Sequence, residues 1–518
     1  MDFFSLLFDT EAAYQKWQYS ESRNRPEYDE VFLNFQMSHI INKIKEECRF
    51  FPDFYIKDFC ASQTTAEYRR EIVSEVYEHQ RLYDGMDELC SALGRLKQAY
   101  LEYRDSKHKI QVQYQYLHFL NLYFNCIEQI YDIFHDCESQ GLRALRDRVS
   151  IYQAASEYRN IKEKVDVLYA ELQKIFSINL SFYFPERAFE TQYEYKHGGV
   201  IERIDKTVKN LFDIDITKEF SVVSNHPFSA LEEAVVHKAI ADFPELFEQL
   251  EEIYDEEFKI LKFIFFDLPE QFYFYTGYVN FIKNMQKTGL RFCLPEYTKE
   301  MQIVCDNAYD LSLAVRFLGG DKKVTHNDIG VKDVHGFILT GANQGGKTTH
   351  LRNIGIIACL ANNGLFVPCD KCEISHFDHI LTHFNKAEVV GYKKGRLGEE
   401  VERFENIIRV ATNKSLVLTN ESFASTRRLD GVELSIYFLK KLKDINCLFG
   451  MVTHYYEIYD LINEEYPDTD ILQSLVVAVN KDNSAERLYK VMNLPPNTIA
   501  YARDIARMCG VTLEQLIY

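Results

Sequence analysis

The segment Gly341–Thr349, GANQGGKTT, combines three glycines with a lysine and two threonines. It satisfies the pattern G-x-x-x-x-G-K-[ST], a glycine-rich turn whose backbone N–H groups can approach phosphate oxygens closely. Lys347 would contact the β- and γ-phosphates of a nucleotide, and the Thr348 hydroxyl would ligate Mg²⁺. The segment therefore predicts a site for ATP and Mg²⁺. Its predicted ATP-binding residues are Gly341, Gly345, Gly346, Lys347, Thr348 and Thr349.

The residues on either side of this segment suit the same chemistry. The apolar run Phe337–Thr340 predicts a strand before it, and the run from Lys347 to about Ala361 predicts a helix after it. The N-terminus of such a helix adds a partial positive charge that favours phosphate. A glycine turn without function would not need this context.

A second apolar run, 415–420, ends in Asn420 and Glu421. In a sheet of this kind such a strand usually delivers an aspartate to Mg²⁺, and a following glutamate acts as the base that polarises the attacking water. Glu421 fits the base. Asn420 stands at the aspartate position, as a predicted metal-site residue together with Thr348, and its amide oxygen supplies no charge. One unit charge at ~4 Å is worth about 4 kcal/mol at an effective dielectric near 20, so we expect slow hydrolysis.

Two further polar features lie near these strands. His454 ends the run Met451–Val452–Thr453 and is expected to sense the γ-phosphate, although a lone histidine is more often structural. Glu399 and Glu400 could return negative charge to the Mg²⁺ shell. The alternative for this acidic pair is a solvated helix start.

The C-terminal part of the chain alternates short apolar runs with helical stretches or loops, which predicts an α/β domain with a largely parallel core sheet. The predicted strands are Phe337–Thr340, His379–Phe384, Ser415–Asn420, Cys447–Thr453 and Leu475–Asn480.

The first 300 residues predict long helices instead. No proline occurs between Pro52 and Pro185. A stripe of apolar residues at steps of three or four predicts one face of a single long helix, formed by Ile151, Ala155, Tyr158, Ile161, Val165, Leu168, Leu172 and Ile175. The segment 179–199 is expected to be an irregular tip with a short β-excursion. Helices resume at a capping box, Ser229 with Glu232, and are expected to kink at Pro244.

The expected fold is therefore multidomain: an all-α core of lever helices with a small clamp insertion, followed by an α/β P-loop ATPase domain of the ABC class. The expected limits are 1–60 for an N-terminal lead-in, 61–304 for the helical core with its tip at 179–199, and 305–518 for the ATPase domain.

Composition limits the possible partners and the cellular location. The formal net charge of −19 argues against a basic surface, so any DNA would be met by a confined groove or by loop tips. No apolar run reaches the roughly 18 residues that span a bilayer, and the N-terminus does not read as a secretory signal, so we expect a cytoplasmic protein whose cysteines are thiols. Cys369 and Cys372 form the only close cysteine pair, and zinc needs four ligands, so the spacing does not predict a metal there.

Taken in order, four stretches resemble the DNA mismatch-repair MutS family. They are GFILTGANQGGKTTHLRNIGIIACLANNGLFVP, SLVLTNESFASTRRLDG, MVTHYYEIYDL and RLYKVMNLPPNTIAYARDIARMCGV. This resemblance implies a homodimer through the ATPase domain that clamps on mismatched or branched DNA. It also implies that Asn343 belongs to the phosphate loop, that Asn327 lies near the adenine, and that Ser425 and Thr426 approach the partner's nucleotide.

The chain departs from the family pattern at several points. The family's N-terminal mismatch-recognition domain has no counterpart, and no nuclease domain is expected after the ATPase. Asn420 replaces the usual aspartate, Leu397-Gly398-Glu399 replaces Ser-Thr-Phe, and Phe423-Ala424-Ser425 replaces Gly-Arg-Gly. Two other hypotheses stay open: a nucleotide-switched protein-interaction module that has lost DNA contact, and a different ABC-class ATPase.

Overall fold

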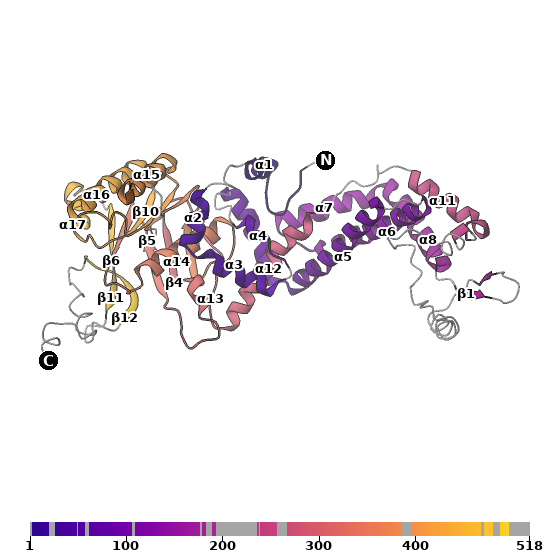
Figure 1. The fold of residues 1–518 in the computed structure, drawn as a ribbon, viewed down its shortest axis with the longest axis horizontal. Coiled ribbons are helices and arrows are strands. Elements are labelled where there is room, and N and C mark those ends of the chain that lie inside the picture. The colour runs from indigo at the N-terminus through magenta and orange to yellow at the C-terminus, as the bar shows by residue number, and fades with distance from the viewer. Residues whose placement is uncertain are drawn as a thin grey trace. The chain divides into compact units, whose positions relative to one another are not determined.

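The computed structural model (Figure 1) describes residues 3–19, 26–48, 50–56, 62–105, 109–176, 179–182, 189–192, 236–237, 239–255, 267–385, 395–467, 471–479 and 487–496. The chain divides into two compact units. The first comprises Arg81–Glu138 and Leu142–Pro269, and the second comprises Asp2–Gln80, Ser139–Gly141 and Glu270–Tyr518.

The described parts of the first unit are helical, as the sequence predicts, except for two short strands. Aromatic side chains fill the contacts between α6 and its neighbours, with Tyr116, Phe119 and Tyr123 almost fully buried. His118 of α6 lies 2.7 Å from the Tyr169 hydroxyl of α8. The helices are α5 (Gln80–Asp105), α6 (Lys109–Phe134), α7 (Gln140–Ala154), α8 (Ser156–Phe176) and α11 (Pro244–Asp255).

The predicted apolar stripe is confirmed on α8 and wrong at its first residue. Tyr158, Val165, Leu168 and Leu172 are all buried. Ile151 is 74% exposed, because it belongs to the preceding helix α7. The chain leaves the helical conformation between α7 and α8. Residues before this break therefore do not lie on the same helical face as residues after it, although their spacing in the sequence follows the 3.6-residue period.

The tip expected at 179–199 is described only at two short strands. β1 (Asn179–Phe182) pairs antiparallel with β2 (Phe189–Gln192). The predicted capping box at Ser229 and Glu232 lies outside the described residues. At the predicted kink, α11 begins with Pro244, a first helical position at which the missing N–H costs nothing.

The second unit is built on a six-stranded sheet of order β12-β11-β6-β10-β9-β8. The five strands from β11 to β8 are parallel, and β12 is antiparallel at one edge. All five predicted strands and the largely parallel sheet are confirmed. The strands are β6 (Gly336–Thr340), β8 (Ile380–Phe384), β9 (Leu416–Asn420), β10 (Leu448–Val452), β11 (Leu472–Val479) and β12 (Arg487–Asn493).

Helices cover this sheet on both faces. Phe449 and Met451 of β10 belong to an apolar cluster with residues of α15 (Gly395–Val410), α16 (Arg428–Ile445) and α17 (Glu457–Glu465). Because side chains alternate along a strand, the other residues of β10 face α14 (Lys347–Asn362), which also contacts β8 and β9. The predicted helix after the phosphate loop is thus confirmed, and the sheet is a buried core.

The N-terminal helices belong to this second unit. A Cβ on Gly355 of α14 would lie 2.2 Å from the Phe35 ring, and buried Arg69 donates to the Leu7 carbonyl and to the Asn363 side chain. Compact packing therefore joins residues on both sides of the expected limit at 304. The N-terminal elements are α1 (Glu11–Tyr19), α2 (Pro26–Asn34), α3 (Met37–Glu47), the 3₁₀ turn η2 (Asp53–Tyr55) and α4 (Gln63–Glu78). Two later helices that pack in this unit are α12 (Leu268–Lys287) and α13 (Leu311–Arg316).

A smaller sheet of order β3-β7-β4-β5 completes the unit. Its central pair, β4 and β7, is antiparallel, and β5 is the edge strand that pairs with β4. The strands are β3 (Glu296–Thr298), β4 (Ile303–Ala308), β5 (Asn327–Val331) and β7 (Lys371–Ser375).

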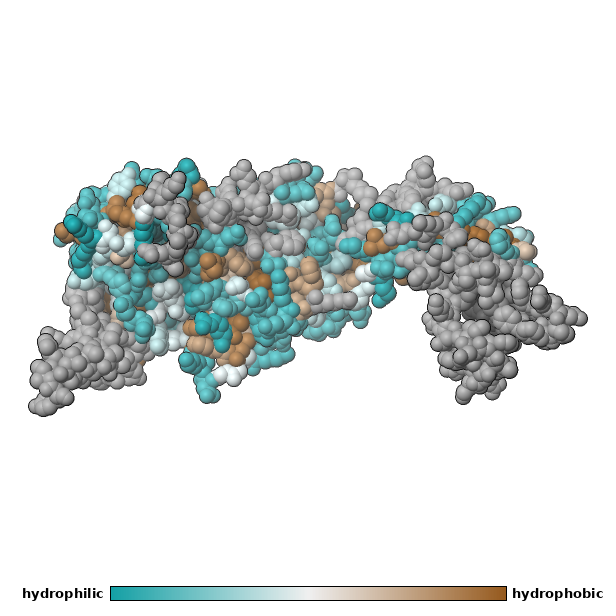
Figure 2. Space-filling view, in the orientation of Figure 1, coloured by the Kyte–Doolittle hydropathy of each residue, from teal (hydrophilic) through white to brown (hydrophobic). Residues whose placement is uncertain are grey.

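The described surface is mostly hydrophilic in the view of Figure 2, where apolar side chains form small separate patches. Within the described parts of the chain, none of the helices combines the length and the apolar character that crossing a membrane requires.

Candidate nucleotide-binding site

The glycine-rich segment joins the central strand β6 to the N-terminus of α14. Gly341 has a φ of +136° and Gly346, the residue before α14, has a φ of +99°. Both values lie in a region that residues with a Cβ rarely adopt. A Cβ on Gly345 would also lie 2.9 Å from the Ala342 carbonyl oxygen. The spacing of the glycines thus follows from the path of the backbone.

Lys347 lies inside this turn and is 5% exposed. Its Nζ donates to the carbonyl oxygens of Gly341 and Ala342, at 3.1 and 3.2 Å, and lies 3.5 Å from Asn343 Oδ1. A buried ammonium needs acceptors on several sides, and the loop supplies them. The same charge is placed where phosphate oxygens would enter.

Thr348 and Asn420, from the start of α14 and the end of β9, come together. The Thr348 hydroxyl donates to Asn420 Oδ1 at 3.1 Å. An octahedral Mg²⁺ ion with Mg–O distances of about 2.0–2.1 Å places neighbouring ligand oxygens roughly 3 Å apart. This oxygen pair therefore fits Mg²⁺ in donor type and separation, but both donors are neutral.

Glu421 and His454 face one another at the carboxyl ends of β9 and β10. His454 Nε2 lies 2.9 Å from Glu421 Oε1. The hydrogen bond from His454 lowers the pKa of Glu421 against the opposing effect of burial, and the charges of His454 and Lys347 lower it further. Glu421 is therefore ionised at neutral pH, as a general base must be. Its φ of +53° is uncommon for a residue with a side chain.

Lys347, Thr348, Glu421 and His454 border one cavity of about 810 Å³, a volume in the range of small-molecule and cofactor sites. The predicted site residues Gly341, Gly345 and Asn420 do not line it. The cavity collects most of the predicted site residues, and it adds others that the sequence did not indicate: Asp310, Leu313, Phe317, Lys322, Lys323, Val324, Thr325, Gln344, His350, Asn353 and Tyr489. Gln344 belongs to the glycine-rich motif itself, and His350, Asn353 and Tyr489 lie in stretches that resemble the family. The others belong to no motif, so only the fold could reveal them.

Asn327 lines the same cavity, but its amide is used by the backbone. Its Nδ2 donates to the Tyr489 carbonyl at 3.0 Å, and its Oδ1 accepts from the Val491 N–H at 2.9 Å. The side chain therefore ties β5 to β12 and builds a wall of the cavity.

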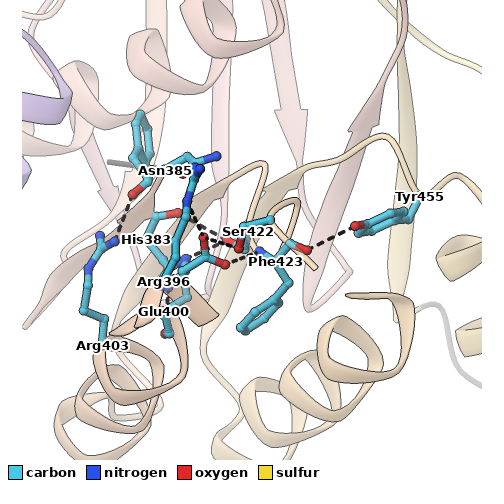
Figure 3. Close-up of polar contacts among 10 residues, drawn as sticks. His383, Asn385, Arg396, Glu400, Arg403, Ser422, Phe423 and Tyr455 are labelled. Carbon is cyan, nitrogen blue, oxygen red and sulfur yellow. Dashed lines mark hydrogen bonds and ion pairs between the residues drawn. The ribbon is translucent and has the colours of Figure 1, made fainter. Parts of the chain in front are cut away.

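The segment that carries Ser425 and Thr426 lies after β9 and does not border the cavity. Its anchor is Glu400, which is 4% exposed (Figure 3). Glu400 Oε2 accepts from the Phe423 N–H at 2.9 Å, and Oε1 accepts from the Ser425 hydroxyl at 3.1 Å. Both carboxylate oxygens are thus committed to this segment. For Glu400 this geometry contradicts both the hypothesis that it supplies charge to Mg²⁺ and the alternative of a solvated helix start. Glu399 is partly exposed and does not line the cavity, and its role stays a prediction.

Two aromatic residues complete this support. His383 Nδ1 lies 2.7 Å from the Ser422 hydroxyl, and the Tyr455 hydroxyl donates to the Phe423 carbonyl at 3.1 Å (Figure 3). The positive φ of Phe423, +59°, is held by contacts on both sides. Glu400 in the second turn of α15, His383 of β8 and Tyr455 after β10 therefore fix the path of residues 422–425.

Comparison with known proteins agrees with this site. Residues 337–515 match the family model of MutS domain V, so the C-terminal region carries a domain of this family, which is an ATPase domain. The DNA mismatch repair protein MutS of Thermus thermophilus is 30% identical over 177 residues, which cover 34% of this chain and 21% of that protein.

Two other relatives give a similar result. The DNA mismatch repair protein MutS of Psychrobacter cryohalolentis is 30% identical over 184 residues, covering 35% of this chain and 18% of that protein. That of Streptococcus suis is 27% identical over 225 residues, covering 43% and 26%. The similarity thus spans about a fifth to a quarter of the length of these relatives. The resemblance predicted from the sequence is confirmed for the ATPase region.

Proposed function

We propose that this chain binds ATP with Mg²⁺ in the cavity at the end of β6 and hydrolyses it slowly to control a dimeric clamp on DNA. The supporting observation is that Lys347, Thr348 and the Glu421–His454 pair line one cavity in a MutS domain V, with Asn420 hydrogen-bonded to Thr348 beside it.

In the proposed reaction the glycine turn and the start of α14 hold the phosphates through N–H groups, and Lys347 neutralises the β- and γ-phosphates. Mg²⁺, held by Thr348 and Asn420, would supply charge neutralisation of the phosphate oxygens. Glu421 polarises the attacking water through the carboxylate oxygen that His454 does not hold. His454 orients that carboxylate and keeps it ionised.

The rate follows from the neutral metal site. Asn420 offers Mg²⁺ an oxygen without charge, so metal binding is weaker than with an aspartate while the base is unchanged. Slow turnover suits a switch, because the ATP-bound state then persists between hydrolysis events.

Dimerisation and DNA contact extend the proposal beyond the cavity. Ser425 and Thr426 follow β9 on an anchored loop beside the start of α16, and Leu429 there is 82% exposed. A partner ATPase domain would cover this surface and bring Ser425 and Thr426 to its own nucleotide. The helices of the first unit would act as levers and clamp on mismatched or branched DNA in the cytoplasm. The names of the relatives, which say DNA mismatch repair, support a role on DNA.

A second candidate function is a nucleotide-switched protein-interaction module. The net charge of −19 favours it, since DNA binding depends on basic groups that neutralise phosphates. Such a module would keep the ATP cavity and exchange the DNA contact for a protein partner.

Binding measurements separate these functions. We expect the purified chain to bind ATP, and Lys347→Ala to weaken ATP binding at least ~10-fold, because hydrogen bonds from a charged group are worth about 1.5–3 kcal/mol each. Lys414→Ala, at an exposed lysine outside the cavity, serves as control. Unchanged ATP affinity in Lys347→Ala would refute the nucleotide site.

DNA binding is then measured with homoduplex, mismatched and branched DNA at two salt concentrations, with and without ATP. We expect ATP-dependent binding to mismatched or branched DNA that weakens steeply with salt. If no DNA is bound even at low salt, the protein-interaction module replaces the clamp.

A further inference from the structure

Three cysteine thiols of the second unit gather in one place outside the nucleotide cavity, and a fourth, Cys293, contacts one of them. The sulfur atoms of Cys305, Cys369 and Cys372 all lie within 4.8 Å of one another. Cys293 Sγ lies 3.5 Å from Cys369 Sγ, and Cys305 Sγ lies 3.6 Å from Cys372 Sγ. Cys305, Cys369 and Cys372 are at most 1% exposed, and Cys293 is half-buried.

The backbone fixes each of these positions. Cys305 of β4 and Cys372 of β7 are direct partners in an antiparallel register. Cys293 exchanges two backbone hydrogen bonds with Val367, of 3.1 and 2.8 Å, and the Cys369 N–H donates to the same Val367 carbonyl. The four thiols therefore meet because three chain segments are paired there.

We propose that Cys293, Cys305, Cys369 and Cys372 bind one Zn²⁺ ion as a tetrathiolate structural site. Zn–S bonds of about 2.3 Å in a tetrahedron place the sulfur atoms roughly 3.8 Å apart. The two separations of 3.5 and 3.6 Å are close to this edge. Cys293 lies farther than 4.8 Å from at least one of Cys305 and Cys372, so its side chain would move toward the other three thiols when the ion binds. A disulfide needs a separation of about 2.05 Å, which neither pair approaches.

The donor set selects the metal. Four soft thiolates in tetrahedral array suit zinc or iron, and a closed set of four protein ligands without an open position is typical of structural zinc. Cys369 and Cys372 form the Cys-x₂-Cys half of such a site. The other half is two single cysteines that lie 76 and 67 residues from their partners in this pair, so spacing alone could not indicate it.

The position of the cluster defines its role. The ion would join the segment after α12 to β4 and β7. β4 also pairs with β5, whose Asn327 forms a wall of the nucleotide cavity. None of the described residues that line the cavity is a cysteine. Zinc would therefore stabilise the small sheet and the cavity wall without taking part in the chemistry.

Metal analysis of the full chain tests this site. We expect about one zinc per chain by elemental mass spectrometry after dialysis against metal-free buffer. Cys369→Ser and Cys372→Ser should lose the zinc, and Cys447→Ser should keep it. Cys447 is a matched control, because it is a buried thiol of the same unit outside the cluster. Zinc retained in both cluster variants would overturn the proposal.

Cobalt substitution of the parent protein gives a readout that does not depend on how the variants fold. Co²⁺ exchanged for zinc should show the visible and sulfur-to-cobalt charge-transfer bands of a tetrahedral tetrathiolate. A parent chain without bound metal that takes up neither Zn²⁺ nor Co²⁺ would overturn the site. Iron in place of zinc, or disulfide bonds among these four cysteines, would overturn the assignment to zinc.

Discussion

Restoring a carboxylate at the metal position should tighten Mg²⁺ binding and speed hydrolysis. In Asn420→Asp the new oxygen keeps the position of Asn420 Oδ1, 3.1 Å from the Thr348 hydroxyl. A unit charge ~4 Å from another is worth about 4 kcal/mol at an effective dielectric near 20, and a divalent ion doubles this to about 8 kcal/mol. Desolvation of the carboxylate and repulsion from adjacent Glu421 offset most of that gain.

We expect a net gain of about 1–3 kcal/mol in Mg²⁺ affinity, or roughly 10- to 100-fold, because each 1.4 kcal/mol is tenfold. The assay is steady-state ATP turnover as a function of Mg²⁺ concentration, with the half-saturating concentration as the readout. Turnover at saturating Mg²⁺ should also rise, because a carboxylate ligand holds the ion more firmly at the position where it neutralises the phosphate oxygens.

The repulsion from Glu421 gives an internal check. Without Mg²⁺ two carboxylates would lie next to each other, so Asn420→Asp should unfold at lower temperature than the parent, and Mg²⁺ with ATP should reverse the difference. Asn420→Ala removes the oxygen without adding charge and should bind Mg²⁺ more weakly. If Asn420→Asp leaves both the half-saturating Mg²⁺ concentration and the turnover unchanged, the neutral amide is not the reason for slow hydrolysis.

Three further substitutions test the supports of the site. His454→Ala removes the largest cause of the lowered pKa of Glu421, so the acid limb of the pH–rate profile should move to higher pH; an unmoved limb would contradict the role of this pair. Glu400→Ala should cost about 2–4 kcal/mol of stability and slow hydrolysis while ATP affinity persists, because two hydrogen bonds to the Ser425 segment are lost. Glu400→Gln should lose less stability and less turnover. Thermal unfolding and ATP turnover measure these effects, and equal turnover in the parent and both variants would exclude an anchoring role. Gly364→Ala should lower the free energy of unfolding by more than ~1 kcal/mol, because its φ is +70° and the new Cβ would lie 2.1 Å from the Ala66 carbonyl oxygen. The control Gly94→Ala, in open space on α5, should raise the free energy of unfolding slightly. Denaturant unfolding measures both, and equal effects would refute this reasoning.

Local sequence patterns accounted for the strands and for the phosphate loop. Buried parallel strands are apolar throughout, so the runs that became β6, β8, β9, β10 and β11 could be recognised one by one. The glycine spacing at Gly341 and Gly346 reflects backbone angles that are local to the turn. The prediction of one helix from Ile151 onward was wrong, because the spacing of apolar residues does not show the short break between α7 and α8.

By itself, the sequence determined which segment forms the glycine-rich turn, which residues end the strands beside it, and that Asn420 brings no charge. These features depend on neighbouring residues, whose backbone angles and alternation are set over a few positions. Only the tertiary structure decided that Glu400 anchors the Ser425 segment, that Asn327 is held by β12, and that four cysteines meet. Each of these contacts joins residues far apart in sequence, and strand order and helix packing, which no local pattern records, bring them together.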